Sequence, residues 1–330
     1  ALRLVVINLV SFLLLYLLSP VILVGVLGYL LSVLGVLGLQ RAGVAIVTLK
    51  RLSWSFFVPL LFVPYIPLEF VVRGLLGDSA LSQAGIMGVA LLGFSYTAIR
   101  SFMLVRQALE GTPARLLEQA ATLLFFGSFS AGPISNAKPW QALEARLTGE
   151  MAVVAGARFL WGAAAFLVLS PAMQALPTQD WFGLAACSMP AAWVGLWQNF
   201  LALYLDFSGY THIAIACGLL FGARLPENFS WPLRSTSIQE FWQRWHRSLG
   251  AFISMYLFKP LVRKFGKPTL AIFMAFVFVG IWHQASVLYL LWGVGHGAAL
   301  ALNMMWTKSE TARALPAGLK YPRVVLGGFV

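Results

Sequence analysis

Long apolar runs follow one another along the chain, with short polar segments between them. Residues 1–37 are almost all apolar, and Ser19-Pro20 predicts a bend within them because proline removes a backbone donor. This stretch is too long for the apolar core of a signal peptide, so it predicts one bent membrane helix or two shorter ones. The apolar pattern predicts further membrane helices over 83–109, 114–129, 151–169, 181–205 and 269–306.

Three segments interrupt this helical pattern. Prolines 59, 64 and 67 disfavour a regular helix over 54–72. The sequence FFGSFSAGPI, Phe125–Ile134, contains a Gly-Pro turn signal and predicts a re-entrant or broken helix. Irregular backbone at membrane depth has to be buried in protein or line a cavity. The segment 170–180 predicts a loop, and we expect it on the outer side because it holds one acidic residue and no basic one.

Composition assigns the broad class. Mean hydropathy is +0.82 and only 10% of residues are charged, against about 25% in soluble domains. With roughly 20 residues per crossing, the chain predicts an all-α polytopic membrane protein of about nine or ten transmembrane or re-entrant helices. Membrane lipids are then its immediate partners. Nucleic acid is excluded, because no basic soluble domain is present to bind it. Cys187 and Cys217 lie in apolar segments and are expected to be small buried side chains.

The segment 237–257, SIQEFWQRWHRSLGAFISMYL, concentrates charge, tryptophan and a histidine in an otherwise apolar chain. Ser237 and Glu240 have the spacing of a capping box, so a helix is predicted to start here. Continued helical spacing would place Glu240, Arg244 and Arg247 on one side. The segment fits an amphipathic helix in the membrane interface or an active-site helix carrying His246, and its composition alone does not separate them.

Polar residues also occur inside a predicted membrane helix. Asn199 and Asp206 are seven residues apart, which places them on one helix face. A carboxylate at the centre of a membrane helix costs about 2.5–3.5 kcal/mol, so Asp206 is expected to face a polar interior or a cation. A purely structural ion pair remains open. Tyr210 and His212 extend the polar patch, and His212 is expected to be a hydrogen-bonded core residue.

Residues 224–267 carry eight of the 23 basic residues of the chain and two acidic ones. This excess predicts a cytoplasmic location, because Lys and Arg collect in cytoplasmic loops. Clustered cations also attract phosphate-bearing molecules. The segment therefore fits the mouth of a site for a phosphopantetheine thioester, or binding of anionic lipid headgroups.

Two more histidines follow within 269–306. His283 lies in GIWHQAS and His296 in GVGHG; in one continuous helix their rings would be roughly 20 Å apart and would not share a reacting atom. An ionisable residue among apolar neighbours indicates function, and His283 is expected to be the more deeply embedded because its preceding run is the more hydrophobic. Neither histidine has the spacing of a zinc site, so no metal is predicted.

Taken in order, these motifs resemble a known family. FFGSFSAGPI, the DFSGY and PENF motifs, EFWQRWH, GIWHQAS and GVGHG are similar to the bacterial branch of the membrane-bound O-acyltransferase superfamily. That branch includes the membrane subunit of alginate O-acetylation and the D-alanyl transferase of teichoic acid modification. The resemblance covers 93–306.

The resemblance implies a ring of helices with a thinned centre, where a tunnel brings a cytosolic acyl thioester to an acceptor from the opposite face. His283 corresponds to the near-invariant histidine of the family and His246 to the second histidine. The segment between them is shorter than in relatives, and the family continues beyond VVLGGFV, where this chain stops. We expect 1–330 to be one integral membrane acyltransferase domain that lacks its C-terminal helices.

Acyl transfer from a thioester to a hydroxyl needs a base, donors for the developing oxyanion and exclusion of water. His283 is predicted to be the base, because a buried neutral imidazole accepts a proton. His246 is predicted to polarise the thioester carbonyl, orient the acceptor or relay the proton. No serine or cysteine has the context of a nucleophile, which favours direct transfer. The predicted substrate contacts are Trp242, Arg244, Trp245, Trp282, Asn199, Asp206, Tyr210, Gln239 and Glu240, and the predicted phosphate-facing rim is Arg247 and Lys259.

The resulting prediction is an O-acyltransferase of the bacterial cytoplasmic membrane that moves an acetyl group to an extracytoplasmic polysaccharide. The expected cosubstrate is acyl-CoA or an acyl-phosphopantetheine carrier, with no bound cofactor. The expected partner is an extracytoplasmic acyltransferase or a polymer-export complex. D-alanyl transfer or acylation of a lipid or protein is the alternative within the same class. A transporter or an inactive scaffold is the alternative of another class, although no inverted repeat supports transport.

Overall fold

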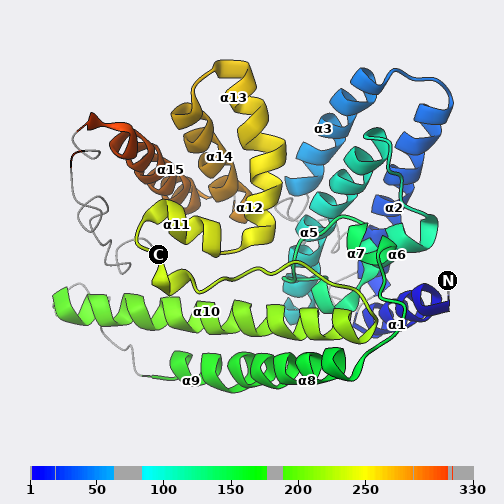
Figure 1. The fold of residues 1–330 in the computed structure, drawn as a ribbon, viewed down its shortest axis with the longest axis horizontal. Coiled ribbons are helices and arrows are strands. Elements are labelled where there is room, and N and C mark those ends of the chain that lie inside the picture. Colours follow the sequence, from blue (N-terminus) through cyan, green and yellow to red (C-terminus); the bar gives the residue numbers. More distant parts are fainter. Residues whose placement is uncertain are drawn as a thin grey trace. The chain divides into compact units, whose positions relative to one another are not determined.

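A computed structural model describes residues 2–18, 20–62, 84–176, 189–284, 286–310 and 314. These residues form helices, turns and loops and no strand (Figure 1). The chain divides into two compact units, one of Ala1–Phe159 with Ile213–Pro226 and the other of Leu160–His212 with Glu227–Val330. The all-α fold class is therefore confirmed, while the prediction of one domain over 1–330 stays a prediction.

The first unit holds most of the N-terminal helices. It contains α1 (Leu2–Leu18), α2 (Pro20–Arg41), α3 (Ile46–Phe62), α5 (Ala84–Leu109), α6 (Leu116–Leu124), the 3-10 turn η3 (Phe126–Ser128) and α7 (Lys138–Gln141). Two helices, α8 (Gly149–Ala164) and α10 (Met189–Leu220), contribute to both units.

The second unit contains the shorter C-terminal helices and the tryptophan-rich segments. Its elements are the π-helical turn η4 (Ala165–Leu169), α9 (Ser170–Gln174), the 3-10 turn η5 (Pro232–Arg234), α11 (Ile238–Arg244), α12 (Arg247–Ile253), the π-helical turn η6 (Ser254–Phe258), α13 (Lys259–Phe265), α14 (Pro268–His283) and α15 (Val287–Lys308).

Proline marks a helix boundary at one of two predicted positions and is accommodated within a helix at the other. The predicted bend at Ser19-Pro20 is confirmed, since α1 ends at Leu18 and α2 begins at Pro20. The predicted irregularity over 54–72 is wrong up to Phe62, because α3 continues through Pro59. The remaining residues of that segment, 63–72, lie outside the described residues.

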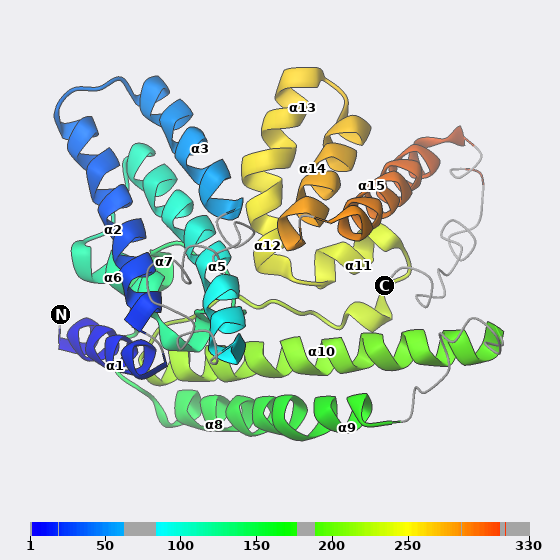
Figure 2. The same cartoon turned by 180° about the vertical axis from the view of Figure 1, so that it is seen from behind.

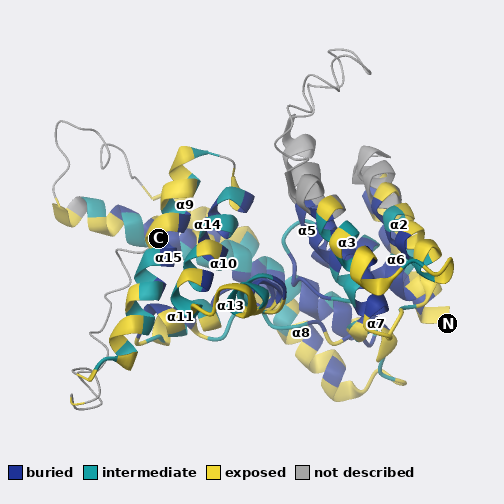
Figure 3. Cartoon of the chain, turned by 90° about the horizontal axis from the view of Figure 1, so that it is seen from above, coloured by how far each residue is buried: buried dark blue, intermediate teal, exposed yellow. Residues whose placement is uncertain are grey.

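The predicted loop at 170–180 is wrong in its first part. Instead of ending at Leu169, the helix continues through η4 into α9, where proline is tolerated in the first turn; residues 177–180 lie outside the described residues. Within the described part of the chain, three helical stretches are long and apolar enough to cross a membrane: Gly149–Ala175, Ala192–Leu220 and Val287–Lys308. Large apolar side chains are exposed on α8, including Val153 and Leu160 (Figure 3).

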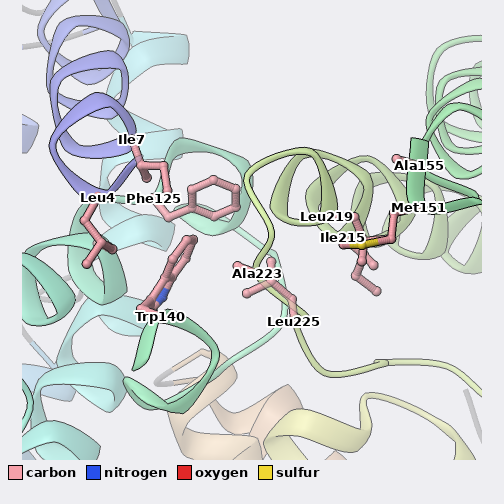
Figure 4. Close-up of a cluster of buried hydrophobic side chains, with 11 residues drawn as sticks. Leu4, Ile7, Phe125, Trp140, Met151, Ala155, Ile215, Leu219, Ala223 and Leu225 are labelled. Carbon is pink, nitrogen blue, oxygen red and sulfur yellow. The ribbon is translucent and has the colours of Figure 1, made fainter. Parts of the chain in front are cut away.

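A buried cluster organises the first unit around the FFGSFSAGPI segment. Phe125 packs against Trp140 at a ring-centroid distance of 4.9 Å, and both contact a core that includes Ile7 of α1 (Figure 4). The guanidinium of buried Arg100 in α5 donates to the Ser128 carbonyl. The helix is broken as predicted, because α6 ends at Leu124 and the chain continues as a 3-10 turn.

Helices α14 and α15 form a tightly packed hairpin in the second unit (Figure 2). The chain leaves α14 at Gln284, and the Ser286 hydroxyl caps α15 by accepting from the Tyr289 N–H. The two backbones approach at Gly280 and Gly293, where a Cβ on Gly280 would lie 2.3 Å from the Tyr289 carbonyl oxygen. Small residues at a helix crossing permit this close approach.

A glycine-to-alanine pair within α15 tests this crossing. In Gly293→Ala the new Cβ would lie 2.6 Å from the Phe276 carbonyl oxygen, so the hairpin has to open. We expect a loss of about 1–3 kcal/mol of stability, measured as the thermal unfolding of detergent-solubilised protein. Gly295→Ala is the matched control, because nothing lies within 4 Å of its Cβ. Equal unfolding temperatures for the two variants would contradict the packing.

Candidate active site

The helix that was predicted to begin at Ser237 does so, and then stops after two turns. The Ser237 hydroxyl accepts from the Glu240 N–H at 3.1 Å, which confirms the serine half of the predicted capping box. The Glu240 carboxylate accepts from the Thr236 N–H, one residue before the cap. The continuous helix through 237–257 is wrong, because α11 ends at Arg244 and α12 starts only at Arg247. His246, between them, has left-handed backbone angles, φ 43° and ψ 53°. Glu240 and Arg247 therefore do not lie on one face of one helix.

Aromatic packing surrounds this break. The Trp245 ring stacks on Phe241 at 5.6 Å and on Phe200 of α10 at 5.5 Å, and meets the Phe229 ring edge-on at 5.0 Å. The His246 imidazole stands edge-on to Phe207 of α10 at 4.7 Å. Burying both rings against α10 requires the chain to leave the helix, which gives the break its physical cause.

His246 is the titratable group at the centre of this cluster. It is 4% exposed and lies in the turn between α11 and α12, outside the long apolar helices. Burial and, as a smaller cause, the charge of nearby His283 lower the pKa of its imidazole from 6.5 to about 3. His246 is therefore neutral at physiological pH, and it is close enough to His283 to sense its charge.

His283 ends α14 and is ringed by aromatic side chains. Its imidazole lies 4.8 Å from Trp282, 5.7 Å from Trp292 and 6.2 Å from Tyr289, measured between ring centroids. The expectation that His283 is the histidine more deeply embedded in the membrane stays a prediction. Within the protein, His283 is exposed at the end of α14, whereas His246 and His296 are 4% and 5% exposed.

The helical hairpin also changes the relation between His283 and His296. The two residues lie on different helices, so the separation expected for one continuous helix does not apply. Trp292 contacts both rings, His296 at 4.5 Å and His283 at 5.7 Å, and His296 also lies 5.2 Å from Trp242 of α11. A chain of ring contacts therefore connects the GVGHG and GIWHQAS motifs to α11.

An apolar cavity of about 250 Å³ opens beside His246. Its walls come from α11, α12, η6, α14 and α15, and include Trp242, Phe276 and Leu300. Four of the residues predicted for the site line it, namely Gln239, Trp242, Trp245 and His246. The cavity provides room for a small apolar group next to a neutral imidazole.

Two other predicted residues are engaged in holding α11. The Arg244 guanidinium donates to a Glu240 carboxylate oxygen at 2.7 and 3.0 Å and to the Ser230 carbonyl at 3.0 Å. The N–H and hydroxyl of Thr236 donate to the same carboxylate and, together with Arg244, lower the pKa of Glu240. These bonds give Glu240 and Arg244 a structural role, and their contact with substrate stays a prediction.

The remaining predicted residues are spread over the second unit. Asn199 is exposed and donates to the Gly195 carbonyl of its own helix, and its contact with substrate stays a prediction. Asp206 is partly buried, and Tyr210 packs edge-on against Phe166. Trp282 is buried beside His283, and Arg247 and Lys259 are exposed. None of these six lines the His246 cavity.

The sequence interpretation missed Asn228 of the PENF motif. This residue is fully buried, and its side chain and backbone bond to three other residues around the break at His246. The available signal was an asparagine in the short segment that follows an apolar run. Its partners, however, lie 17 to 20 residues away, and no helical or strand periodicity brings them together.

The long apolar helices indicate an integral membrane protein. The same chain carries a site with a buried histidine. The model of the family described as MBOAT, membrane-bound O-acyltransferase, matches residues 51–313. The chain therefore belongs to this family, which confirms the resemblance read from its motifs.

The names of similar proteins agree with this assignment. The chain is 31% identical over 247 residues to a probable alginate O-acetylase of Pseudomonas syringae, covering 72% of this chain and 48% of the relative. It is 37% identical over 119 residues to a peptidoglycan O-acetyltransferase of Helicobacter pylori (35% and 23%). It is 26% identical over 244 residues to a teichoic acid D-alanyltransferase of Bacillus subtilis (67% and 60%). The chain spans about half the length of the alginate relative that it matches.

Proposed function

We propose that the protein transfers an acyl group from a thioester donor to a hydroxyl of an extracytoplasmic polymer. Acetyl is the favoured group, because relatives named for the O-acetylation of alginate and of peptidoglycan match this chain. D-alanyl transfer is supported by the more distant teichoic acid relative. The donor is acyl-CoA or an acyl-phosphopantetheine carrier, and the site of action is the bacterial cytoplasmic membrane.

The observation that carries this proposal is the buried neutral imidazole of His246 on the wall of an apolar cavity. An acyl thioester ends in a small apolar group and a polarisable carbonyl. The cavity accepts the first, and a neutral imidazole N–H donates to the second. A water-poor site strengthens such a hydrogen bond. Because it also excludes water as an attacking group, it favours acyl transfer over hydrolysis.

The two histidines divide the chemistry between them. His283 accepts the proton of the attacking hydroxyl while the hydroxyl oxygen bonds to the thioester carbonyl carbon. The N–H of His246 stabilises the negative charge that develops on the carbonyl oxygen. Collapse of the tetrahedral species re-forms the carbonyl and breaks the carbon–sulfur bond. The proton held by His283 then passes to the departing thiolate, which balances the reaction as thioester plus alcohol giving ester plus thiol.

The exposed cations Arg247 and Lys259 suit the phosphate groups of the donor. An alginate relative belongs by name to polymer O-acetylation, which supports a polymer-modification system with further subunits. An extracytoplasmic acyltransferase or a polymer-export complex is the partner we propose.

Incubation of the full-length protein in lipid vesicles with radiolabelled acetyl-CoA and an uronic-acid polymer tests the proposal. We expect alkali-labile label on the polymer or on an acceptor protein, because an ester is the product. A parallel arm uses an acetylated phosphopantetheine carrier as donor. Movement of the label across the membrane with no ester formed would overturn the enzyme assignment in favour of transport.

A further inference from the structure

The backbone of His246 has an unfavourable conformation between α11 and α12. Its φ of 43° lies in the left-handed region, which residues other than glycine, asparagine and aspartate seldom adopt. Such a conformation persists only where the surrounding structure determines it. The irregular segment 227–231, which precedes η5 (Figure 1), provides that structure.

Two backbone hydrogen bonds from this segment bracket Trp245 and His246. The Ser230 N–H donates to the Arg244 carbonyl at 3.0 Å, just before the break. The Arg247 N–H donates to the Asn228 carbonyl at 2.9 Å, just after it. The break is therefore fixed at both ends by residues two apart in the same segment.

The side chain of Asn228 connects this bracket to two helices. Its Oδ1 accepts from the Ser248 hydroxyl of α12 at 2.5 Å, and its Nδ2 donates to the Thr211 hydroxyl of α10 at 3.3 Å. Asn228 is 0% exposed, Thr211 2% and Ser248 5%, so water does not substitute for these bonds. A carboxamide supplies both the acceptor and the donor that these two hydroxyls require.

The same face of α10 supports the imidazole itself. Phe207, which stands edge-on to the His246 ring, precedes Thr211 by four residues and is therefore one helical turn away on the same face. The ring of His246 and the side chain of Asn228 consequently rest on one surface of α10. A shift of Asn228 would therefore shift the His246 backbone relative to Phe207, the ring that orients the imidazole.

We propose that Asn228 is a positioning residue for acyl transfer, which holds His246 in the orientation where its N–H reaches the thioester carbonyl. The inference rests on the proposed role of His246. It assigns to the PENF motif a function that needs no contact with substrate.

Steady-state kinetics of Asn228→Ala measures this role. We expect kcat to fall about 100-fold, because a displacement of about 1 Å at a reacting group has that effect, while KM for the donor stays close to wild type. Thr211→Val removes one of the two side-chain bonds and should lower kcat about fivefold. Thr211→Ser keeps the hydroxyl and should restore it. Thr307→Val is the matched control, since the Thr307 hydroxyl bonds to the Met304 carbonyl of its own helix.

A double-mutant cycle separates this inference from the proposed function. If Asn228 acts through His246, adding Asn228→Ala to His246→Ala lowers the remaining activity little further. Full additivity of the two losses would overturn the positioning role, as would Thr211→Ser and Thr211→Val with equal kcat. A fully active His246→Ala would instead refute the proposed function. The threonine pair keeps the test decisive if Asn228→Ala fails to fold.

Discussion

Replacing His283 by alanine is expected to abolish acyl transfer while the protein remains folded and inserted in the membrane. Loss of a positioned base costs about 10²–10⁴-fold in rate, and the proposed mechanism gives the role of base to His283. The measurement is acyl transfer by purified variants, normalised to the amount of monodisperse protein.

His212→Gln is the matched control for this experiment. His212 lies in α10, and the proposed chemistry does not use it. We expect turnover of this variant near the wild-type value. Near-normal turnover by His283→Ala would remove the base assignment, and inactivity of His212→Gln at unchanged stability would show that the site extends along α10.

Replacing His246 is expected to reduce transfer strongly, and the size of the loss depends on the replacement. Removal of one oxyanion donor costs about 10²–10³-fold in kcat, so His246→Ala should fall by that amount. Glutamine keeps an N–H donor but cannot act as a base, so His246→Gln should retain more activity than His246→Ala. Equal losses in both variants would contradict the donor role.

The pH dependence of His246→Gln gives a second test of that role. Because burial lowers the pKa of His246 to about 3, the wild-type imidazole is neutral across about pH 5 to 8. Its replacement should therefore lower kcat/KM uniformly over this range and leave the shape of the profile unchanged. Disappearance of an acidic limb near pH 6.5 would show instead that His246 titrates as a base.

Local rules read from the sequence account for the class of the protein and for several helix ends. Hydropathy indicated a membrane protein. Ser237 and Glu240 predicted the start of α11, and Ser19-Pro20 predicted the boundary between α1 and α2. The membrane class follows from the composition of the whole chain. The two helix ends depend on residues within one helical turn of each other, and a sequence pattern is informative over that range. The order of the motifs also identified the family before any distance was known.

Other features depend on contacts between residues far apart, and the sequence interpretation missed or misjudged them. The helix through Trp245 and His246 has no breaking residue, yet it breaks because both rings bury against Phe200 and Phe207 of α10. The separation of His283 and His296 was estimated for one continuous helix, but the chain turns at Gln284 and places them on two helices.

The sequence by itself determined that this chain is a helical membrane protein of an acyltransferase family with two candidate histidines. Only the tertiary structure decided how those histidines are presented. It placed His246 in a left-handed conformation beside an apolar cavity, and it joined the turn at His246 to other helices through Asn228. It also folded α15 back against α14. The physical reason is that helix propensity acts over a few residues, whereas the burial of rings and hydroxyls against α10 depends on partners brought together only by folding.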